Sequence, residues 1–190
     1  TEGDKVVLWG GGIYNWFDPL TLLRAVDKLR SRLPEVRLYF LGLRHPNPQV
    51  GEMKMTDDAV ALAHELGLVG THVFFNEDWV DYDDRQNYFL EADIGVSTHL
   101  DHVETEFSFR TRLLDYLWAS LPIVATAGDS LAGLIETRDI GIAVPAGDVD
   151  ALEAALFRIL DDEAFHASCR AAIERVASDY RWSKVLEPLL

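Results

Sequence analysis

Acidic and basic side chains gather between Glu104 and Asp115. Glu104 and Glu106 are followed by Arg110 and Arg112, and Asp115 comes three residues later. Carboxylates can accept hydrogen bonds from sugar hydroxyl groups, whereas guanidinium groups match phosphate oxygens in pairs. One site that holds both kinds of side chain suits a phosphorylated sugar. The alternative is a local salt-bridge network, for example between Arg112 and Asp115 on one helix face.

These charged residues lie within the stretch Ser97–Asp129, between two apolar runs typical of buried strands. The pattern predicts an acidic loop followed by a helix over Phe109–Ser120. With Ser108 as its N-cap, Arg110 and Arg112 would stand in or just past the first turn. Positive charge at that end opposes the helix dipole, so it indicates that an anion binds there.

A glycine run, Gly10–Gly12, follows the first apolar run of the chain. The dinucleotide-binding fingerprint needs a third glycine, but Asn15 occupies its place, and Arg44 rather than an acid follows the second expected strand. We therefore expect a turn at Gly11 and Gly12 that lets a ligand approach the backbone closely. A simple tight turn is the alternative.

Further candidates lie in loops after expected strands. Arg44 could contact a second phosphate, or it could belong to a solvated loop. Trp16 and Trp79 could stack on a base or a sugar, or they could cover the end of the sheet. Trp118 and Trp182 have apolar neighbours at helical spacing, and we expect them in the core.

His99, His102 and Glu104 have the spacing of metal ligands, with Asp101 among them. The segment reads as an irregular loop, in which such spacing fixes no coordination geometry. We expect solvated side chains or polar contacts to a ligand here, and neither a metal nor another cofactor.

Short apolar runs alternate with helical patterns along the whole chain. Parallel strands need crossover connections, so this order predicts an α/β fold: a doubly wound, Rossmann-like parallel sheet with helices on both faces. Long loops over 44–56 and 98–107 would follow the carboxyl ends of strands, where such sheets bind ligands. The expected strands are Lys5–Trp9, Val36–Gly42, His72–Phe75, Ile94–Ser97, Pro122–Thr126 and Gly141–Val144. Helices are expected from Pro19 with Asp18 as N-cap, from Asp57, over Tyr82–Ala92, Phe109–Ser120 and Asp129–Thr137, and from Val149 to about Tyr180.

Composition limits the partners. The 190 residues include 17 Lys and Arg against 32 Asp and Glu, a net charge of −15. This balance argues against nucleic acid and against contact of this portion with an anionic membrane. The single cysteine, Cys169, excludes a disulfide framework. With neither an apolar run of about 20 residues nor a signal peptide, we expect a cytoplasmic location. The start at Thr1 suggests a piece of a longer protein, with 1–190 forming one domain.

The segment ETEFSFRTRLLDYLWASLPIVAT resembles the donor-site signature of the family-four retaining glycosyltransferases with the GT-B fold. Their pattern reads E-G-F-G-x-x-x-x-E, followed by A-x-G-x-P-V-V-A-T. The run GIAVPAGDVDALEAALFRILDD and the closing Tyr180-Arg181-Trp182 extend the resemblance over nearly the whole chain. Matching positions in the signature are Glu106, Phe107, Asp115, Ala119, Pro122, Ile123, Val124, Ala125 and Thr126.

The chain departs from that family pattern at the charged positions. The second acid is Asp115, and the first is displaced to Glu106 or further to Glu104. The family also places an arginine and a lysine in the loop after the first strand, where this chain has neither. Arg110 and Arg112 would supply the positive charge from the other side of the site.

The resemblance implies a donor-binding domain, the C-terminal half of a two-domain enzyme whose missing N-terminal half binds the acceptor. The partner would be a nucleotide diphosphate sugar. By position, Asp115 would bind the ribose hydroxyls, and Glu106 or Glu104 a hydroxyl of the transferred sugar. Arg110 and Arg112 would neutralise charge on the leaving phosphate.

The same resemblance assigns backbone contacts and a base site. The N–H groups around Phe107, Ser108 and Phe109 would touch the sugar or its phosphate, and the rim at Trp79 and Val80 would receive the base. Transfer of the glycosyl group would retain the anomeric configuration, and the isolated domain would be inactive. A sugar-nucleotide epimerase of related architecture and a non-catalytic nucleotide-binding module are the alternatives. Product analysis without acceptor and transfer of labelled sugar would separate them.

Overall fold

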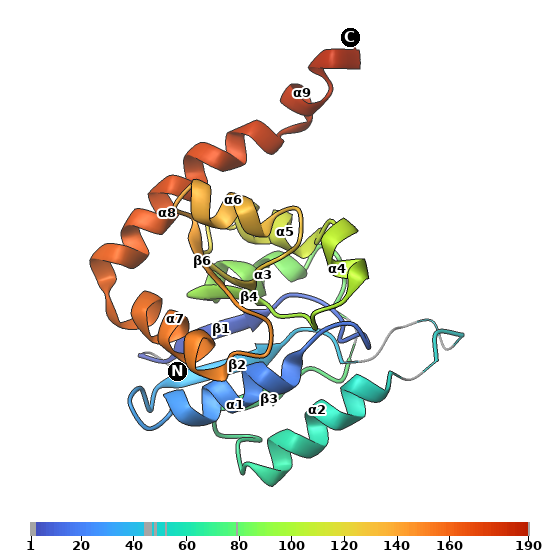
Figure 1. The fold of residues 1–190 in the computed structure, drawn as a ribbon, viewed down its shortest axis with the longest axis vertical. Helices are drawn as coiled ribbons and strands as arrows, with labels where there is room; N and C mark the ends of the chain where they lie inside the picture. Colours follow the sequence, from blue (N-terminus) through green and yellow to red (C-terminus); the bar gives the residue numbers. More distant parts are fainter. Residues whose placement is uncertain (1–2, 44–46, 48, 52, 79, 190) are drawn as a thin grey trace.

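Six strands form one sheet in the order β3-β2-β1-β4-β5-β6 (Figure 1). In the computed structural model, which describes residues 3–43, 47, 49–51, 53–78 and 80–189, all neighbouring strands are parallel. The predicted Rossmann-like sheet is therefore confirmed, with strand ends that differ from the prediction by at most two residues. The strands are β1 (Lys5–Trp9), β2 (Val36–Phe40), β3 (Val73–Phe75), β4 (Ile94–Ser97), β5 (Ile123–Thr126) and β6 (Gly141–Val144).

Helices cover both faces of the sheet, which is why the central strands are apolar on both sides. One face packs against α1 (Pro19–Leu29), α2 (Lys54–Glu65) and α7 (Val149–Asp161). The other face packs against α3 (Arg85–Glu91), α5 (Arg112–Trp118), α6 (Ala132–Thr137) and α8 (Glu163–Ala177). Figure 1 shows these two layers below and above the sheet.

The start of α1 agrees with the prediction from the sequence, whereas the starts of α2 and α5 differ from it. The Asp18 carboxylate accepts a hydrogen bond from the Thr21 N–H at 3.0 Å, which confirms the predicted cap of α1. The α2 helix begins at Lys54 rather than Asp57. The α5 helix begins at Arg112 rather than Phe109, and a short helix, α4 (Val103–Phe107), occupies part of the expected loop.

Two tryptophans that were expected in the core are exposed. Trp118 is 59% exposed and Trp182 is 77% exposed, so this prediction was wrong. Trp118 is the last residue of α5 and points away from the apolar face that Leu113 and Leu117 bury. Trp182 begins α9 (Trp182–Val185), which buries no side chain and leads away from the sheet (Figure 1).

The strand order reverses direction between β1 and β4, whose carboxyl ends therefore meet at the switch point of the sheet. Tyr116 of α5 joins these two ends. Its hydroxyl accepts a hydrogen bond from the Gly10 N–H at 2.9 Å and lies 2.8 Å from the Val96 carbonyl oxygen. None of the helices in the described residues is long and apolar enough to cross a membrane.

Candidate functional site

The loops that follow β1 and β4 are joined at this edge of the sheet. An isolated antiparallel bridge pairs Phe17 with His99. The Asp18 N–H donates to the Thr98 carbonyl at 3.0 Å, and the Thr98 hydroxyl donates to the Asp18 carbonyl at 2.6 Å. Open α/β sheets bind ligands in the crevice at such a switch point, so these loops define the candidate site.

Arg112 lies beside the glycine turn and is 9% exposed. Its Nη2 donates to the Gly12 carbonyl at 3.0 Å. The guanidinium carbon lies 4.1 Å from the centre of the Phe17 ring and 4.6 Å from that of Trp9. Burial lowers the pKa of Arg112 to about 10, so the side chain still carries its charge at neutral pH. A buried cation is thereby fixed next to the backbone of the turn.

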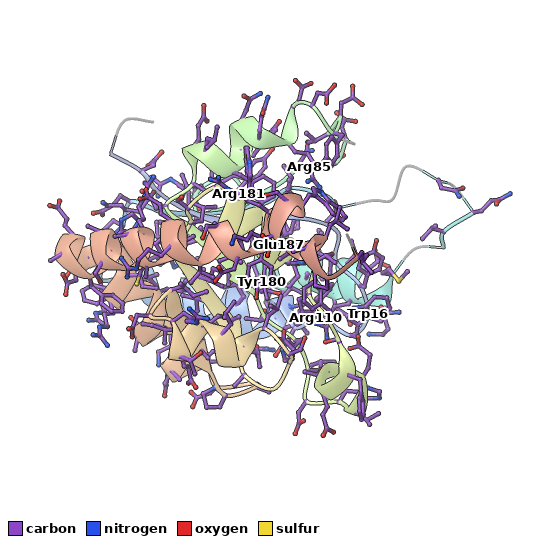
Figure 2. The ribbon with its side chains drawn as sticks, turned by 90° about the horizontal axis from the view of Figure 1, so that it is seen from above. Trp16, Arg85, Arg110, Tyr180, Arg181 and Glu187 are labelled. Carbon is purple, nitrogen blue, oxygen red and sulfur yellow. The ribbon has the colours of Figure 1, made fainter. Side chains whose placement is uncertain are left out.

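Arg110 is 6% exposed and makes a two-pronged ion pair with Glu104. Nη1 lies 3.1 Å from Oε1 and Nη2 lies 2.8 Å from Oε2. The guanidinium carbon is 5.2 Å from the centre of the Phe17 ring, the same ring against which Arg112 packs. Figure 2 shows Arg110 and Trp16 at the same edge of the molecule as α4.

The two arginines leave positive charge and hydrogen-bonding capacity unmatched. Arg110 Nε and Arg112 Nη1 are buried and have no hydrogen-bond partner among the described residues. Glu104 is paired with Arg110, while Arg112 has only a neutral carbonyl acceptor. Buried N–H donors without acceptors are uncommon and unfavourable, particularly on charged groups. The arrangement is therefore incomplete, and an anion with several acceptor oxygens would complete it.

The position of Ser108 differs from the prediction. It follows the last residue of α4 instead of capping α5, and its hydroxyl donates to the Thr105 carbonyl at 3.0 Å. Arg110 consequently lies in the connection between the helices, and α5 spans only Arg112–Trp118. Burial against Phe17, rather than a helix dipole, is what fixes the two guanidinium groups.

Asp115 lies on α5 and pairs with Arg85 of α3, not with Arg112 as a local network would require. Arg85 Nη2 donates to Asp115 Oδ1 at 3.1 Å, and the Arg85 guanidinium carbon lies 4.7 Å from the centre of the Tyr82 ring. Burial raises the pKa of Asp115, and Arg85 opposes that rise. Asp115 is partly exposed, and its Oδ2 has no hydrogen-bond partner in the described part of the chain. This oxygen remains able to accept a hydroxyl.

The three residues with metal-ligand spacing have separate roles. His99 is buried, with Nε2 3.1 Å from the Thr126 carbonyl and 3.7 Å from Asp129 Oδ2. The His102 ring accepts the Glu104 N–H and caps α4. Within the described ranges, no three His, Cys, Asp or Glu side chains are grouped to hold a metal. The expectation of a solvated side chain is wrong for His99, which is buried beneath the loops at this edge of the sheet.

A sequence model of the family described as "Glycosyl transferases group 1" matches residues 4–162. The chain belongs to this family. It is 28% identical over 164 residues to a phosphatidyl-myo-inositol mannosyltransferase of Mycolicibacterium smegmatis, which corresponds to 86% of this chain and 38% of that protein. The chain thus spans well under half the length of this relative.

Solved structures with this fold include glycosyltransferases. Sucrose-phosphate synthase from Thermosynechococcus elongatus matches with a TM-score of 0.76 and 21% identity, over 100% of this chain and 44% of the other. Anabaena HepE in complex with UDP and glucose matches with a TM-score of 0.76 and 16% identity, over 98% of this chain and 48% of the other. The C-terminal domain of the Francisella tularensis glycosyl transferase group 1 family protein LpcC matches with a TM-score of 0.76 and 13% identity, over 94% of this chain and 87% of the other. The fold is that of a C-terminal GT-B domain.

Among the remaining candidates in this group 1 domain, Gly11 lies beside Arg112. Gly11 has a φ of +147°, a backbone conformation in which any residue with a side chain would be strained, and an added Cβ would lie at an ordinary contact distance of 3.7 Å from Arg112 Nη2. Glu106 and Phe107 are exposed on α4, and Val80 is half-buried at the edge of the α3 layer. Arg44 and Trp79 lie outside the described residues.

Sequence reasoning missed Arg85 and Phe17. Both guanidinium groups pack against the Phe17 ring, whereas the sequence indicated the neighbouring Trp16 as the candidate aromatic residue of that loop. Arg85 is the first residue of α3, 30 positions before its partner. A cation at the start of a helix was the available signal for Arg85, the same signal that singled out Arg110.

Proposed function

We propose that this domain binds a nucleotide diphosphate sugar and serves transfer of its glycosyl group to an acceptor with retention of anomeric configuration. The observation that carries the proposal is a pair of buried donors, Arg110 Nε and Arg112 Nη1, which have no partner among the described residues; Arg112 lies next to the glycine turn. Family membership supports glycosyl transfer as the reaction class. UDP bound to HepE, which has the same fold, supports a nucleotide donor.

The diphosphate is assigned to the edge of the sheet formed by Gly11, Gly12 and the two guanidinium groups. When the bond between the anomeric carbon and the diphosphate oxygen breaks, negative charge develops on the leaving diphosphate. Arg110 and Arg112 lie where they can stabilise that charge, and they are already held in place by Phe17. An acceptor hydroxyl oxygen then forms its bond to the anomeric carbon on the same face of the sugar, and its proton passes to the departing diphosphate oxygen.

Asp115 is assigned to the ribose, because Oδ2 is available while Arg85 holds Oδ1. Glu104 or Glu106 of α4 is assigned to a hydroxyl of the transferred sugar. Of the N–H groups around Phe107, Ser108 and Phe109, the one of Phe109 is assigned to the sugar or its phosphate, because the Ser108 N–H already donates to the Thr105 carbonyl at 3.2 Å. The edge at Val80 is assigned to the base together with Trp79, and Arg44 is assigned to a second phosphate; Trp79 and Arg44 lie outside the described residues.

Separate ligands test the phosphate and ribose assignments. Calorimetric titration with inorganic pyrophosphate and with UDP is run on Arg110→Ala, Arg112→Ala, Asp115→Asn and the exposed control Arg170→Ala. Loss of either site arginine should weaken both ligands about tenfold, because each loses a charge-assisted hydrogen bond. Asp115→Asn should weaken UDP alone, since pyrophosphate has no ribose. Equal affinities in all four variants would refute the assignment.

The transfer reaction itself belongs to the whole protein, and this chain covers 38% of its mannosyltransferase relative. We propose that an N-terminal domain binds the acceptor, that the enzyme is cytoplasmic, and that the isolated chain binds nucleotide without transferring sugar. NMR of the anomeric proton in the first product distinguishes retention from inversion. Conversion of the donor sugar without acceptor would instead favour an epimerase, and binding without any turnover of the whole protein would favour a non-catalytic module.

A further inference from the structure

Glu104 fills both donor positions of the Arg110 fork. Each of its oxygens accepts from a different nitrogen, at 3.1 and 2.8 Å. A phosphate group engages a guanidinium fork through the same pair of parallel hydrogen bonds. Glu104 and a phosphate therefore compete for one set of donors, and only one of them can hold it at a time.

The two partners of this ion pair are held very differently. The Arg110 side chain is 6% exposed and packs against Phe17, whereas the Glu104 side chain is 43% exposed. Hydrogen bonds that hold α4 in place come from other groups, such as the Thr105 hydroxyl, which donates to the Leu100 carbonyl at 3.1 Å. Glu104 can thus rotate into solvent while Arg110 and the α4 backbone remain where they are.

The exchange favours a diphosphate over the internal carboxylate. Glu104 satisfies Nη1 and Nη2 of Arg110 but leaves Arg110 Nε and Arg112 Nη1 without partners. A diphosphate carries more charge and more acceptor oxygens than one carboxylate, so it can engage donors that Glu104 does not satisfy. A partly exposed ion pair is also weak, and is therefore readily displaced.

Building on the function proposed above, we propose that Glu104 is an internal stand-in for donor phosphate, which occupies the Arg110 fork until the diphosphate displaces it. Displacement frees the Glu104 carboxylate beside the bound donor, where it becomes available to a sugar hydroxyl. Glu104 thereby lowers the affinity of the site for an anion alone, because the anion must displace it. A ligand that carries both a diphosphate and a sugar regains part of this loss through the contact of its hydroxyl with the released carboxylate.

Removing the stand-in should strengthen the binding of an anion. Inorganic pyrophosphate is titrated calorimetrically into the wild-type chain, Glu104→Gln, Glu104→Ala and the control Asp101→Asn. The control removes one exposed negative charge three residues away, without touching the Arg110 fork. We expect pyrophosphate to bind about fivefold more tightly to both Glu104 variants, a change of the size expected for a partly exposed ion pair. Asp101→Asn should stay within about twofold of wild type.

Equal or weaker binding by the folded Glu104 variants, checked by circular dichroism, would overturn the inference. An equal gain in Asp101→Asn would also overturn it, because net charge alone would then explain the effect. Arg110→Ala keeps the two proposals apart. If it weakens pyrophosphate binding while Glu104→Gln does not strengthen it, only the stand-in role fails. If no variant differs from wild type, the phosphate assignment itself fails.

Discussion

Arg85 donates from Nη2 to Oδ1 of Asp115 at 3.1 Å, which joins α3 to α5 across 30 residues of sequence. Figure 2 shows Arg85 on the α3 side of the molecule. Within the described residues, this hydrogen bond engages Oδ1 of the carboxylate and not Oδ2. It also counteracts the burial that raises the pKa of Asp115, so Arg85 helps to keep this carboxylate charged.

Replacing Arg85 should therefore raise the pKa of Asp115 further. We expect carboxyl NMR of Arg85→Met to show Asp115 titrating at higher pH than in the wild type, because burial remains and the neighbouring positive charge is gone. In Arg85→Lys, which keeps the positive charge, the pKa of Asp115 should lie between its values in the wild type and in Arg85→Met. An unchanged or lower Asp115 pKa in Arg85→Met would show that the pair does not control this charge.

Tyr116 supports the carboxyl ends of the two central strands, and its removal should destabilise the fold. Its ring lies directly against Gly95, where an added Cβ would be 2.4 Å from the nearest ring carbon. Tyr116→Phe leaves the buried Gly10 N–H without its acceptor. We expect the free energy of unfolding in urea to fall by about 1–3 kcal/mol. A loss below about 0.5 kcal/mol would mean that water or the backbone replaces the hydroxyl.

The sheet could be predicted from the sequence because buried parallel strands appear as short apolar runs. Val6, Val7 and Leu8 of β1 read directly as a strand. The Asp18 cap of α1 could likewise be predicted, because it uses a side chain three residues from its partner. Both signals act within a few residues of the chain, and this is why the order of the strands along the chain was predicted correctly.

Features that depend on distant partners were not predictable in the same way. The α4 helix buries only Thr105, so VETEF shows no apolar period and was expected to be a loop. The burial of Arg110 and Arg112 depends on Phe17, about 95 residues earlier. Spacing could suggest that Asp115 pairs with Arg112, but only the packing of α3 against α5 reveals Arg85.

Arg112 should support binding at the expense of stability. Burial lowers its pKa from 12.5 to about 10, which corresponds to about 3 kcal/mol of unfavourable charge burial. Its contacts with Gly12, Trp9 and Phe17 offset part of that cost. We expect Arg112→Met to unfold in urea with a free energy equal to or above the wild type, while pyrophosphate affinity falls about tenfold.

The exposed Arg170 provides the matched control for that substitution, and Arg170→Met should change neither quantity. A loss of more than about 1 kcal/mol in Arg112→Met would show that Arg112 mainly stabilises the glycine turn. Unchanged pyrophosphate affinity would remove Arg112 from the site.

His99 should make the protein less stable in acid. Burial lowers its pKa from 6.5, an effect that nearby Arg110 reinforces and Asp129 opposes. Below pH 6.5 the unfolded chain therefore binds a proton that the folded chain does not, so the free energy of unfolding falls as the pH falls. This residue alone contributes at most about 1.4 kcal/mol per pH unit. The difference in unfolding free energy between pH 7.5 and pH 5.5 should accordingly be smaller in His99→Gln than in the wild type. The control His64→Gln changes an exposed ring on α2, and its difference should equal that of the wild type. Identical pH dependence in the wild type and His99→Gln would mean that the pKa of His99 is the same in the folded and unfolded states, and this outcome would contradict the prediction.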